Sequence, residues 1–583
     1  MTHESNFIPV ATEITFEKPV KAKRKFVVED LTIKSYGDIH PYFEKLEQHQ
    51  IKNTDELLHW LNYRSELETV IQEHAGWLYI RMSCDTRSEQ HRNDYTFFIN
   101  EIQPKVSVAS NKLNEKLLNS GLIGQVKDLR FKNYFRSVEN HHRIFREENV
   151  PIIAQLQTLE QQYAAIVGEM SITYQGKEYT MPAAANFLRN PERNVREEVF
   201  KLIAARRMQD VDKLNDLYSQ LIKLRHSIAV NAGFANYRDY RFVELDRQYS
   251  VADCEKFHDA VQKKIVPLCR KIDEERKNKL GYDSLKPWDT EVDVQLRPDL
   301  KPFADGADLE KKTLQCLEAV NPKLKNAFSF LPELKRIDLD SRMGKAPGGY
   351  NYPLYETGVP FIFMNASGSL RDVVTLVHEG GHAFHSLLTH SLGFIGFKEF
   401  PSEVAELASM SMELITMAHW NVFFSNNEEL KRAKQTHLQD ILKILPWIAL
   451  IDKFQHWIYT HPEHSVTERM SAWTNLQKQF STGVADWIGF QNYKSAVWQK
   501  QLHLFEVPFY YIEYGIAQLG AIAVWKNYRA NPNDALEKYL SALSLGYSAS
   551  MPDIYSAAGI RFDFSEQYIE QLSEFLTKEI STL

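Results

Sequence analysis

One short segment of this 583-residue chain combines residue types that hold a metal ion with a base beside them. His378 and His382 are four residues apart, and Glu379 directly follows the first of them. On an α-helix, positions four apart lie about 40° from each other around the axis, so both imidazoles can reach one ion. Glu379 can then reach a water on that ion without binding the metal itself. This HExxH spacing predicts zinc-dependent hydrolysis with Glu379 as the general base.

The residues around this segment predict a helix. Ser369 and Asp372 have the three-residue spacing of a capping box, and apolar residues follow at helical spacing. Gly380 and Gly381 each cost about 1 kcal/mol inside a helix. We therefore expect them to let another backbone pack closely, with residues 361–364 as the candidate.

A zinc ion needs a third protein ligand, which leaves one position for water. A second predicted helix starts at Pro401 or Ser402 and carries Glu403, Glu406 and Glu413. Its face mixes Ala, Leu and Met, so these carboxylates are predicted to be buried and to need a partner. Periodicity alone does not choose among the three.

A second unusual segment contains one histidine and three tyrosines. His503 precedes Pro508, which is expected to begin a helix. Tyr510, Tyr511 and Tyr514 follow at helical spacing, so their hydroxyls can converge. Three tyrosines at this spacing more often form an aromatic core stripe, which is the competing interpretation.

The sequence HEGGHAFHS from His378, followed 24 residues after His382 by Glu406 within ELASMSME, resembles the thimet oligopeptidase and oligoendopeptidase F family of zinc metallopeptidases. It is most similar to the oligoendopeptidase F branch. The resemblance covers roughly residues 170–560. It implies that Glu406 is the third zinc ligand, and that Glu413, on the same helix, lies behind the ligands.

The resemblance also implies a role for the segment that contains the tyrosines, and an overall fold. It implies that His503 and paired tyrosines bind the substrate carbonyl and the tetrahedral intermediate, with Tyr510 as first choice and Tyr514 and Tyr511 next. The implied fold is mainly α: a large helical zincin-type metallopeptidase with a small β element beside the active-site helix. A deep substrate channel is expected between its two halves.

The elements that position these residues are predicted to be mostly helices. Apolar residues recur at three- and four-residue spacing, as in residues 211–224. Strand signals occur in residues 172–180, around a turn containing Gly176, and in residues 337–365. A boundary near residues 191–196 would separate an N-terminal helical domain (1–195) from a catalytic metallopeptidase domain (196–583).

Composition narrows the possible partners and location. The net charge is −7, with 69 basic and 76 acidic residues, which argues against a nucleic-acid partner. The four cysteines form no CxxC pair and are expected to be reduced core thiols. Apolar runs fall far short of the ~20 residues of a membrane span, and the N-terminus lacks a secretory signal. We therefore expect a cytoplasmic protein without a membrane partner; the oligomeric state stays open.

Together these observations predict an oligoendopeptidase with one Zn²⁺ ion per chain that hydrolyses internal bonds of short, unfolded peptides. The substrate is expected to lie extended beside residues 361–365 and to add a strand there. Two alternatives remain: a carboxypeptidase-like exopeptidase on the same scaffold, and a non-catalytic peptide-binding protein.

Other histidines are weaker candidates. A purely structural zinc site would need a fourth protein ligand, for which His385 is available. His456, His461 and His464 lie close together in the sequence and could form a second metal site. Surface histidines beside a loop containing proline are the favoured interpretation of these three.

Overall fold

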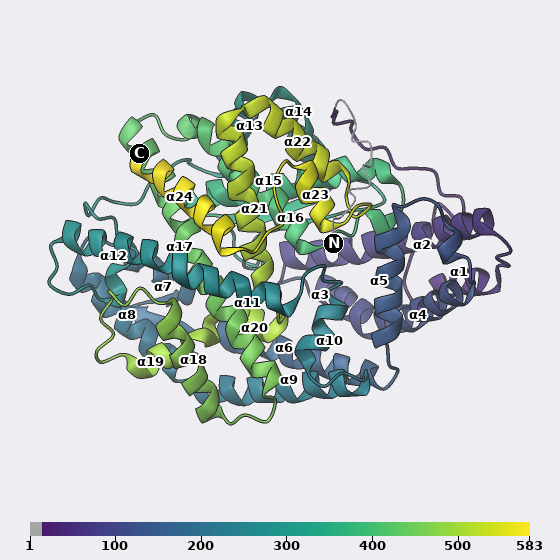
Figure 1. The fold of residues 1–583 in the computed structure, drawn as a ribbon, viewed down its shortest axis with the longest axis horizontal. Helices are drawn as coiled ribbons and strands as arrows, with labels where there is room; N and C mark the ends of the chain where they lie inside the picture. The colour runs from purple at the N-terminus through teal and green to yellow at the C-terminus, as the bar shows by residue number, and fades with distance from the viewer. Residues whose placement is uncertain (1–13) are drawn as a thin grey trace.

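The computed structural model describes residues 14–583 and is mainly helical, as predicted (Figure 1). Residues 1–13, for which the sequence predicts no secretory signal, lie outside the described part. Within that part, no helix is long and apolar enough to cross a membrane.

Four helices near the N-terminus form a bundle around a hydrophobic cluster of their own, drawn in purple and blue on the right of Figure 1. Leu57 and Trp60 are fully buried in this cluster, and Phe394 and Phe397 join it from a distant loop. The helices are α1 (Tyr36–Gln48), α2 (Thr54–Cys84), α4 (Gln103–Asn119) and α5 (Phe131–Ile144). A further helix, α3 (Glu89–Phe97), packs on α2 and has no buried residue.

The rest of the chain forms a larger helical body with a second, continuous core. Its helices, joined in places by short 3-10 and π turns, are α6 (Asn149–Gly168), α7 (Met181–Asn186), α8 (Arg193–Met208), α9 (Val211–Asn231), α10 (Tyr237–Glu244), α11 (Val251–Ala260), α12 (Val266–Leu280), α13 (Gly306–Val320), α14 (Pro322–Glu333), α15 (Leu370–Thr389), α16 (Ser402–Thr416), α17 (Asn427–Thr460), α18 (Val466–Phe480), α19 (Gln491–Ala496), α20 (Leu502–Glu506), α21 (Tyr511–Ala530), α22 (Pro532–Ser544), α23 (Met551–Ala557) and α24 (Glu566–Thr582).

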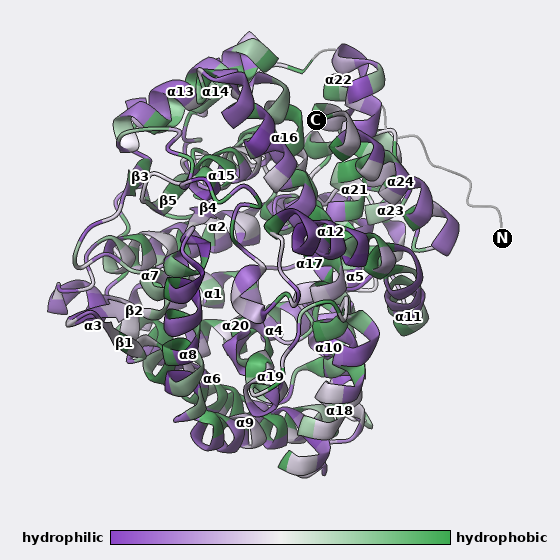
Figure 2. Cartoon of the chain, turned by 90° about the vertical axis from the view of Figure 1, so that its left-hand side faces the viewer, coloured by the Kyte–Doolittle hydropathy of each residue, from purple (hydrophilic) through white to green (hydrophobic). Residues whose placement is uncertain are grey.

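Both predicted β regions are present. β1 (Ser171–Tyr174) and β2 (Lys177–Thr180) form an antiparallel hairpin whose two turn residues, Gln175 and Gly176, have positive φ. β3 (Ile337–Asp340), β4 (Tyr350–Tyr352) and β5 (Phe361–Ala366) form a second sheet in the order β3-β5-β4. Figure 2 shows this sheet beside α15.

The central layer of the larger body is made by α15, α16 and α21, which pack on one another. The predicted capping box starts α15, because the Ser369 and Asp372 side chains each bond the other's backbone. The predicted start of the second helix is also confirmed, since α16 begins at Ser402.

A glycine sets how closely α15 and α16 approach. A Cβ on Gly381 would lie 2.6 Å from the Ala408 carbonyl oxygen and from the Ser409 Cα, both on α16. The prediction that residues 361–364 pack against this glycine was therefore wrong. Gly380 instead faces the Phe328 ring, which a Cβ would meet at 3.4 Å.

Candidate active site

Ligand atoms from two packed helices converge at one point. Nε2 of His378 lies 3.3 Å from Oε2 of Glu406, and Nε2 of His382 lies 3.8 Å from the same oxygen. One ligand atom of each of the three residues lies within 4.8 Å of the other two. Two donor atoms on one tetrahedral zinc ion are about 3.4 Å apart. The three side chains therefore fit a single ion.

Neighbouring side chains hold these ligands in orientation. Nδ1 of His378 lies 2.6 Å from Oε1 of Glu413, so its N–H donates to the carboxylate and leaves Nε2 free to bind a metal. The Ser409 hydroxyl donates to Oε2 of Glu406 at 3.1 Å. The sequence did not identify Ser409 as a partner of Glu406.

The electrostatic environment of the three converging ligand atoms favours a cation. Burial opposes ionisation of Glu406, but the His378 hydrogen bond and the charges of both histidines hold its pKa at about 2. Burial also opposes protonation of His378, yet hydrogen bonds to Glu406 and Glu413 raise its pKa well above the usual value. A position that stabilises a proton between two carboxylates also stabilises a divalent ion.

All three carboxylates considered for the third ligand are buried: Glu403, Glu406 and Glu413 are 2%, 5% and 8% exposed. They occupy different places. Glu406 joins the two histidines, Glu413 lies behind His378, and the charge of Glu403 acts on Glu513 of α21.

Glu379 is only 6% exposed, and within residues 14–583 its Oε2 has no hydrogen-bond partner. Burial raises the pKa of this carboxyl to about 7, with the charges of Glu406 and Glu413 adding to the rise while His378 lowers it. The Asn351 side chain of β4 donates to the Glu379 backbone carbonyl at 3.3 Å, and a hydrogen bond from the Asn351 backbone N–H slightly lowers the pKa of the Glu379 carboxyl. A buried carboxyl with one oxygen still available and a pKa near neutrality is suited to moving a proton.

His503 and the tyrosines lie together on the α20–α21 side of the site. The Tyr510 hydroxyl donates to Oε1 of Glu406 at 3.3 Å, and its ring lies 5.3 Å from that of Tyr514 and 6.0 Å from that of His503. Burial and then the Glu406 charge raise the pKa of both Tyr510 and Tyr514. For Tyr511, burial raises the pKa to about 12, and Gln501 and Trp447 are its partners. Tyr510 is thus the tyrosine whose hydroxyl reaches a ligand residue, whereas the Tyr511 ring is the nearest of the three to His503, at 4.8 Å.

The predicted helix start at Pro508 was wrong. His503 lies within the short helix α20, and α21 begins only at Tyr511. Phe509 between them has a φ of 66°, a left-handed conformation that interrupts the helix and makes Tyr510 its N-cap residue. A sequence rule that allows proline at a first helical turn could not detect this strained residue.

Gln501 is a site residue that the sequence did not indicate. Its Oε1 accepts from the Trp447 indole N–H at 2.9 Å, so its amide N–H₂ faces Nδ1 of His503 at 2.7 Å. Nδ1 is therefore the acceptor, and the His503 proton is on Nε2. Burial lowers the pKa of His503 to about 4, so the ring is neutral at pH 7.

The sheet corrects the expected position of substrate. β5 is the central strand, paired in parallel with β3 and antiparallel with β4. A peptide therefore cannot add to residues 361–365 as predicted. The free edge next to α15 is that of β4, which follows the loop containing Gly348 and Gly349.

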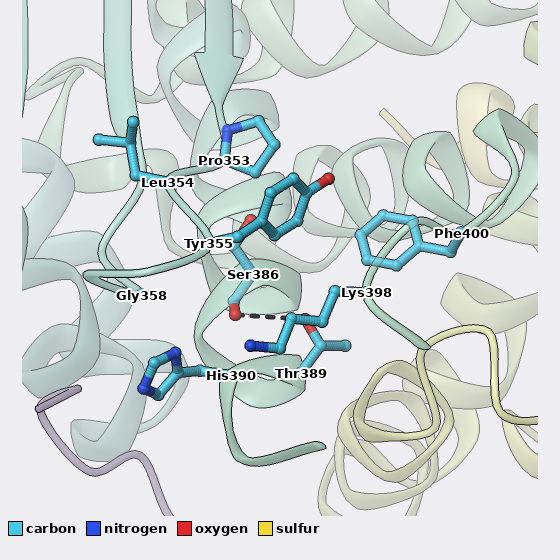
Figure 3. Close-up of a pocket in the computed structure, with 9 residues that line it drawn as sticks. All are labelled: Pro353, Leu354, Tyr355, Gly358, Ser386, Thr389, His390, Lys398 and Phe400. Atoms are coloured by element: carbon cyan, nitrogen blue, oxygen red, sulfur yellow. Dashed lines mark hydrogen bonds between the residues drawn. The ribbon is translucent and has the colours of Figure 1, made fainter. Parts of the chain in front are cut away.

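Two hollows lie near these elements. Figure 3 shows a small one between Pro353, Tyr355, Lys398 and Phe400 at the C-terminal end of α15. Its volume, about 20 Å³, suits a water molecule but no peptide side chain. A larger cavity of about 500 Å³ lies between α2, α4 and α5 and residues 396–401, which lead into α16.

Other predicted candidates do not join the ligand set. His385 is fully buried, stacks on Phe400 with ring centroids 3.5 Å apart, and lies outside the three-residue group. His461 and His464 pack on Trp457, whereas His456 points to a different cluster.

A helical fold with two histidines one turn apart, a carboxylate from the next helix and a free glutamate defines a metallopeptidase. The chain belongs to peptidase family M3, whose model matches residues 186–574, and a model of the peptidase M3 N-terminal domain matches residues 31–145. The predicted family and enzyme class are confirmed. The predicted domain division at residue 195 stays a prediction.

Relatives agree with this assignment. An oligoendopeptidase F homolog of Borreliella burgdorferi is 22% identical over 541 residues, which cover 89% of each chain. Oligopeptidase PepF of Bacillus subtilis is 23% identical over 401 residues, covering 66% of this chain and 56% of that protein. Among solved structures, PZ peptidase A with an inhibitor matches with a TM-score of 0.88 and 26% identity, covering 98% of this chain and 99% of the other.

Proposed function

We propose that this protein is a zinc-dependent oligoendopeptidase that cleaves internal bonds of short peptides. The observation that carries the proposal is the convergence of His378, His382 and Glu406 at distances suited to one ion, with the buried carboxyl of Glu379 nearby. Membership of family M3 supports a peptide substrate.

Nitrogen and carboxylate ligands in a three-residue set are those of a catalytic zinc site. When bound there, a zinc ion supplies Lewis-acid chemistry: it polarises the scissile carbonyl and makes water acidic enough to ionise near neutral pH. Glu379 takes the proton of the attacking water and later delivers it to the leaving amine. Its raised pKa matches both roles.

The oxyanion of the tetrahedral intermediate is stabilised by two hydrogen-bond donors of this chain. The Tyr510 hydroxyl, which otherwise donates to Glu406, turns to the new oxygen. Nε2–H of His503 is the second donor, because Gln501 holds the proton on that nitrogen. Each such donor typically contributes about 10²–10³ in kcat.

The substrate backbone adds to the free edge of β4. Main-chain hydrogen bonds to an edge strand accept any extended sequence, which fits a peptidase acting on many short peptides. Asn351 bonds β4 to the backbone of Glu379 on α15. The strand that binds the substrate and the helix that carries the base are therefore held at a fixed distance from each other.

The test is hydrolysis of an end-blocked, internally quenched peptide by the wild type and by Glu379→Gln, with bound metal measured in both. We expect the wild type to cut internal bonds, and the variant to keep one zinc ion while losing about 10²–10⁴ in kcat. Cleavage confined to peptides with a free carboxyl terminus would favour an exopeptidase. A wild type that binds the ion without cutting any peptide would favour a binding protein.

A further inference from the structure

A second cluster of metal-binding residue types lies between α11 and α17. Cys254 and His258 are four apart on α11, and Asp452 and His456 are four apart on α17. Residues four apart share a helix face, so each helix presents two side chains to the other. The cluster shares no residue with the candidate active site.

The four side chains are close and almost fully enclosed. Oδ2 of Asp452 lies 2.8 Å from Nε2 of His258 and 3.1 Å from Nε2 of His456. One ligand atom each of Cys254, Asp452 and His456 lies within 4.8 Å of the other two. Exposure is 0% for Cys254 and for Asp452, 1% for His258 and 11% for the His456 side chain.

Hydrogen bonding alone leaves this cluster unsatisfied. Oδ1 of Asp452 and Nδ1 of both histidines are buried and have no hydrogen-bond partner among the described residues. The ion-pair partners of Asp452 in residues 14–583 are the two histidines. Three buried polar atoms without a partner in one cluster are costly, and a bound ion is one way to satisfy such a cluster.

We propose that Cys254, His258, Asp452 and His456 bind a second, structural zinc ion. A divalent ion with one thiolate and one carboxylate is electrically neutral, and the Cys254 proton leaves to solvent on binding. Four protein ligands in a buried cluster are the marks of a structural zinc site, and His258, which contacts Asp452, is the nearest candidate for the fourth ligand. A tetrahedral S–Zn–N edge is about 3.5 Å, so Cys254, Asp452 and His456 need move by no more than about 1.3 Å. His258 lies outside this group of three and would have to turn from Asp452 to the ion.

The position of the cluster indicates which part of the protein a bound ion would stabilise. The His456 ring lies 5.3 Å from that of Phe509, and Oε1 of the adjacent Gln455 accepts from the Phe509 backbone N–H at 2.6 Å. Phe509 is the residue with left-handed φ that precedes Tyr510. An ion that fixes α11 to α17 therefore braces the strained turn that presents Tyr510 to the active site.

Cobalt substitution tests this proposal without depending on catalysis. Only Cys254 can give a thiolate–cobalt charge-transfer band at this cluster, whereas the active-site ligands are nitrogen and oxygen. Protein produced in zinc-depleted medium with cobalt should hold two ions per chain and show this near-ultraviolet band. A wild type with one ion and no band overturns the proposal, whatever any variant does.

Variants then show which of the two sites gives rise to the charge-transfer band. Glu406→Gln should lose the active-site ion and keep the band, whereas Cys254→Ser should lose the band and keep the active-site ion. Cys316→Ser is the matched control, because Cys316 is equally buried and bonds only a backbone carbonyl. A band that survives Cys254→Ser would contradict the assignment.

Discussion

Two histidines of the active site have their tautomers fixed by neighbours, in opposite senses. Glu413 accepts the Nδ1 proton of His378, so Nε2 is the nitrogen that can give up its proton and bind a metal. Gln501 donates to Nδ1 of His503, so there Nε2 carries the proton. The first histidine is thereby suited to bind a metal and the second to donate to an oxyanion.

Gln501→Glu should reverse the tautomer of His503. A carboxylate still accepts from Trp447 but also accepts the Nδ1 proton, so Nε2 loses its donor function. We expect kcat to fall about 10²-fold, as for loss of one oxyanion donor, with bound zinc unchanged. In the double variant with His503→Ala the two losses should not add, because both remove the same interaction. Additive losses would show that Gln501 acts elsewhere.

The pKa of His503 also gives a dependence of stability on pH. Burial lowers this pKa from about 6.5 in the unfolded chain to about 4 in the folded one. Below pH 6.5 the unfolded state therefore binds more protons, and stability falls as the pH is lowered toward 4. His503→Gln should show a smaller fall in Tm between pH 7 and pH 5 than the wild type. Parallel curves for the two proteins would contradict this origin.

At the scale of elements, the parts that the sequence predicted correctly depend on local signals. The Ser369–Asp372 capping box and the start of α16 are local, and so are the spacing of His378 and His382 and the hairpin turn at Gly176. What it missed depends on contacts between distant segments.

Two of those misses have a clear physical reason. Phe509 adopts a left-handed backbone conformation that Gln455, on another helix, holds by a hydrogen bond, so no local pattern stops the helix there. Whether β5 has a free edge is decided by β3 and β4 together, and a strand's own sequence does not reveal its neighbours.

Gly381→Ala tests how α15 and α16 position the ligands. The new Cβ would collide with the backbone at Ala408, which must push the helix carrying Glu406 away. We expect a loss of zinc affinity and of stability, measured by competition with a chelator and by thermal unfolding. Gly380→Ala is the matched control: its Cβ meets only the Phe328 ring, and alanine favours the helix by about 1 kcal/mol. Equal behaviour of the two variants would rule out this packing role.

At the scale of the whole molecule, the N-terminal bundle is attached to the catalytic body beside the proposed substrate strand. Phe394 and Phe397 insert into its core, and Arg24 pairs with Glu356 in the segment after β4. The cavity of about 500 Å³ lies between this bundle and residues 396–401, which precede α16. The expected substrate channel between the two halves stays a prediction, and this cavity is its candidate.

The bundle contacts the proposed substrate strand directly through α2. A Cβ on Gly76 would lie 2.5 Å from the Tyr352 ring, so Gly76→Ala must displace this residue of β4. The ligands are on other elements, so we expect KM for a short peptide to rise several-fold with one zinc ion still bound. Gly37→Ala on α1 is the control, because its Cβ meets only the Ser35 hydroxyl at 3.4 Å. If KM is the same in both variants, the bundle does not shape the substrate edge; if it rises only in Gly76→Ala, the N-terminal helices are part of the peptide-binding site.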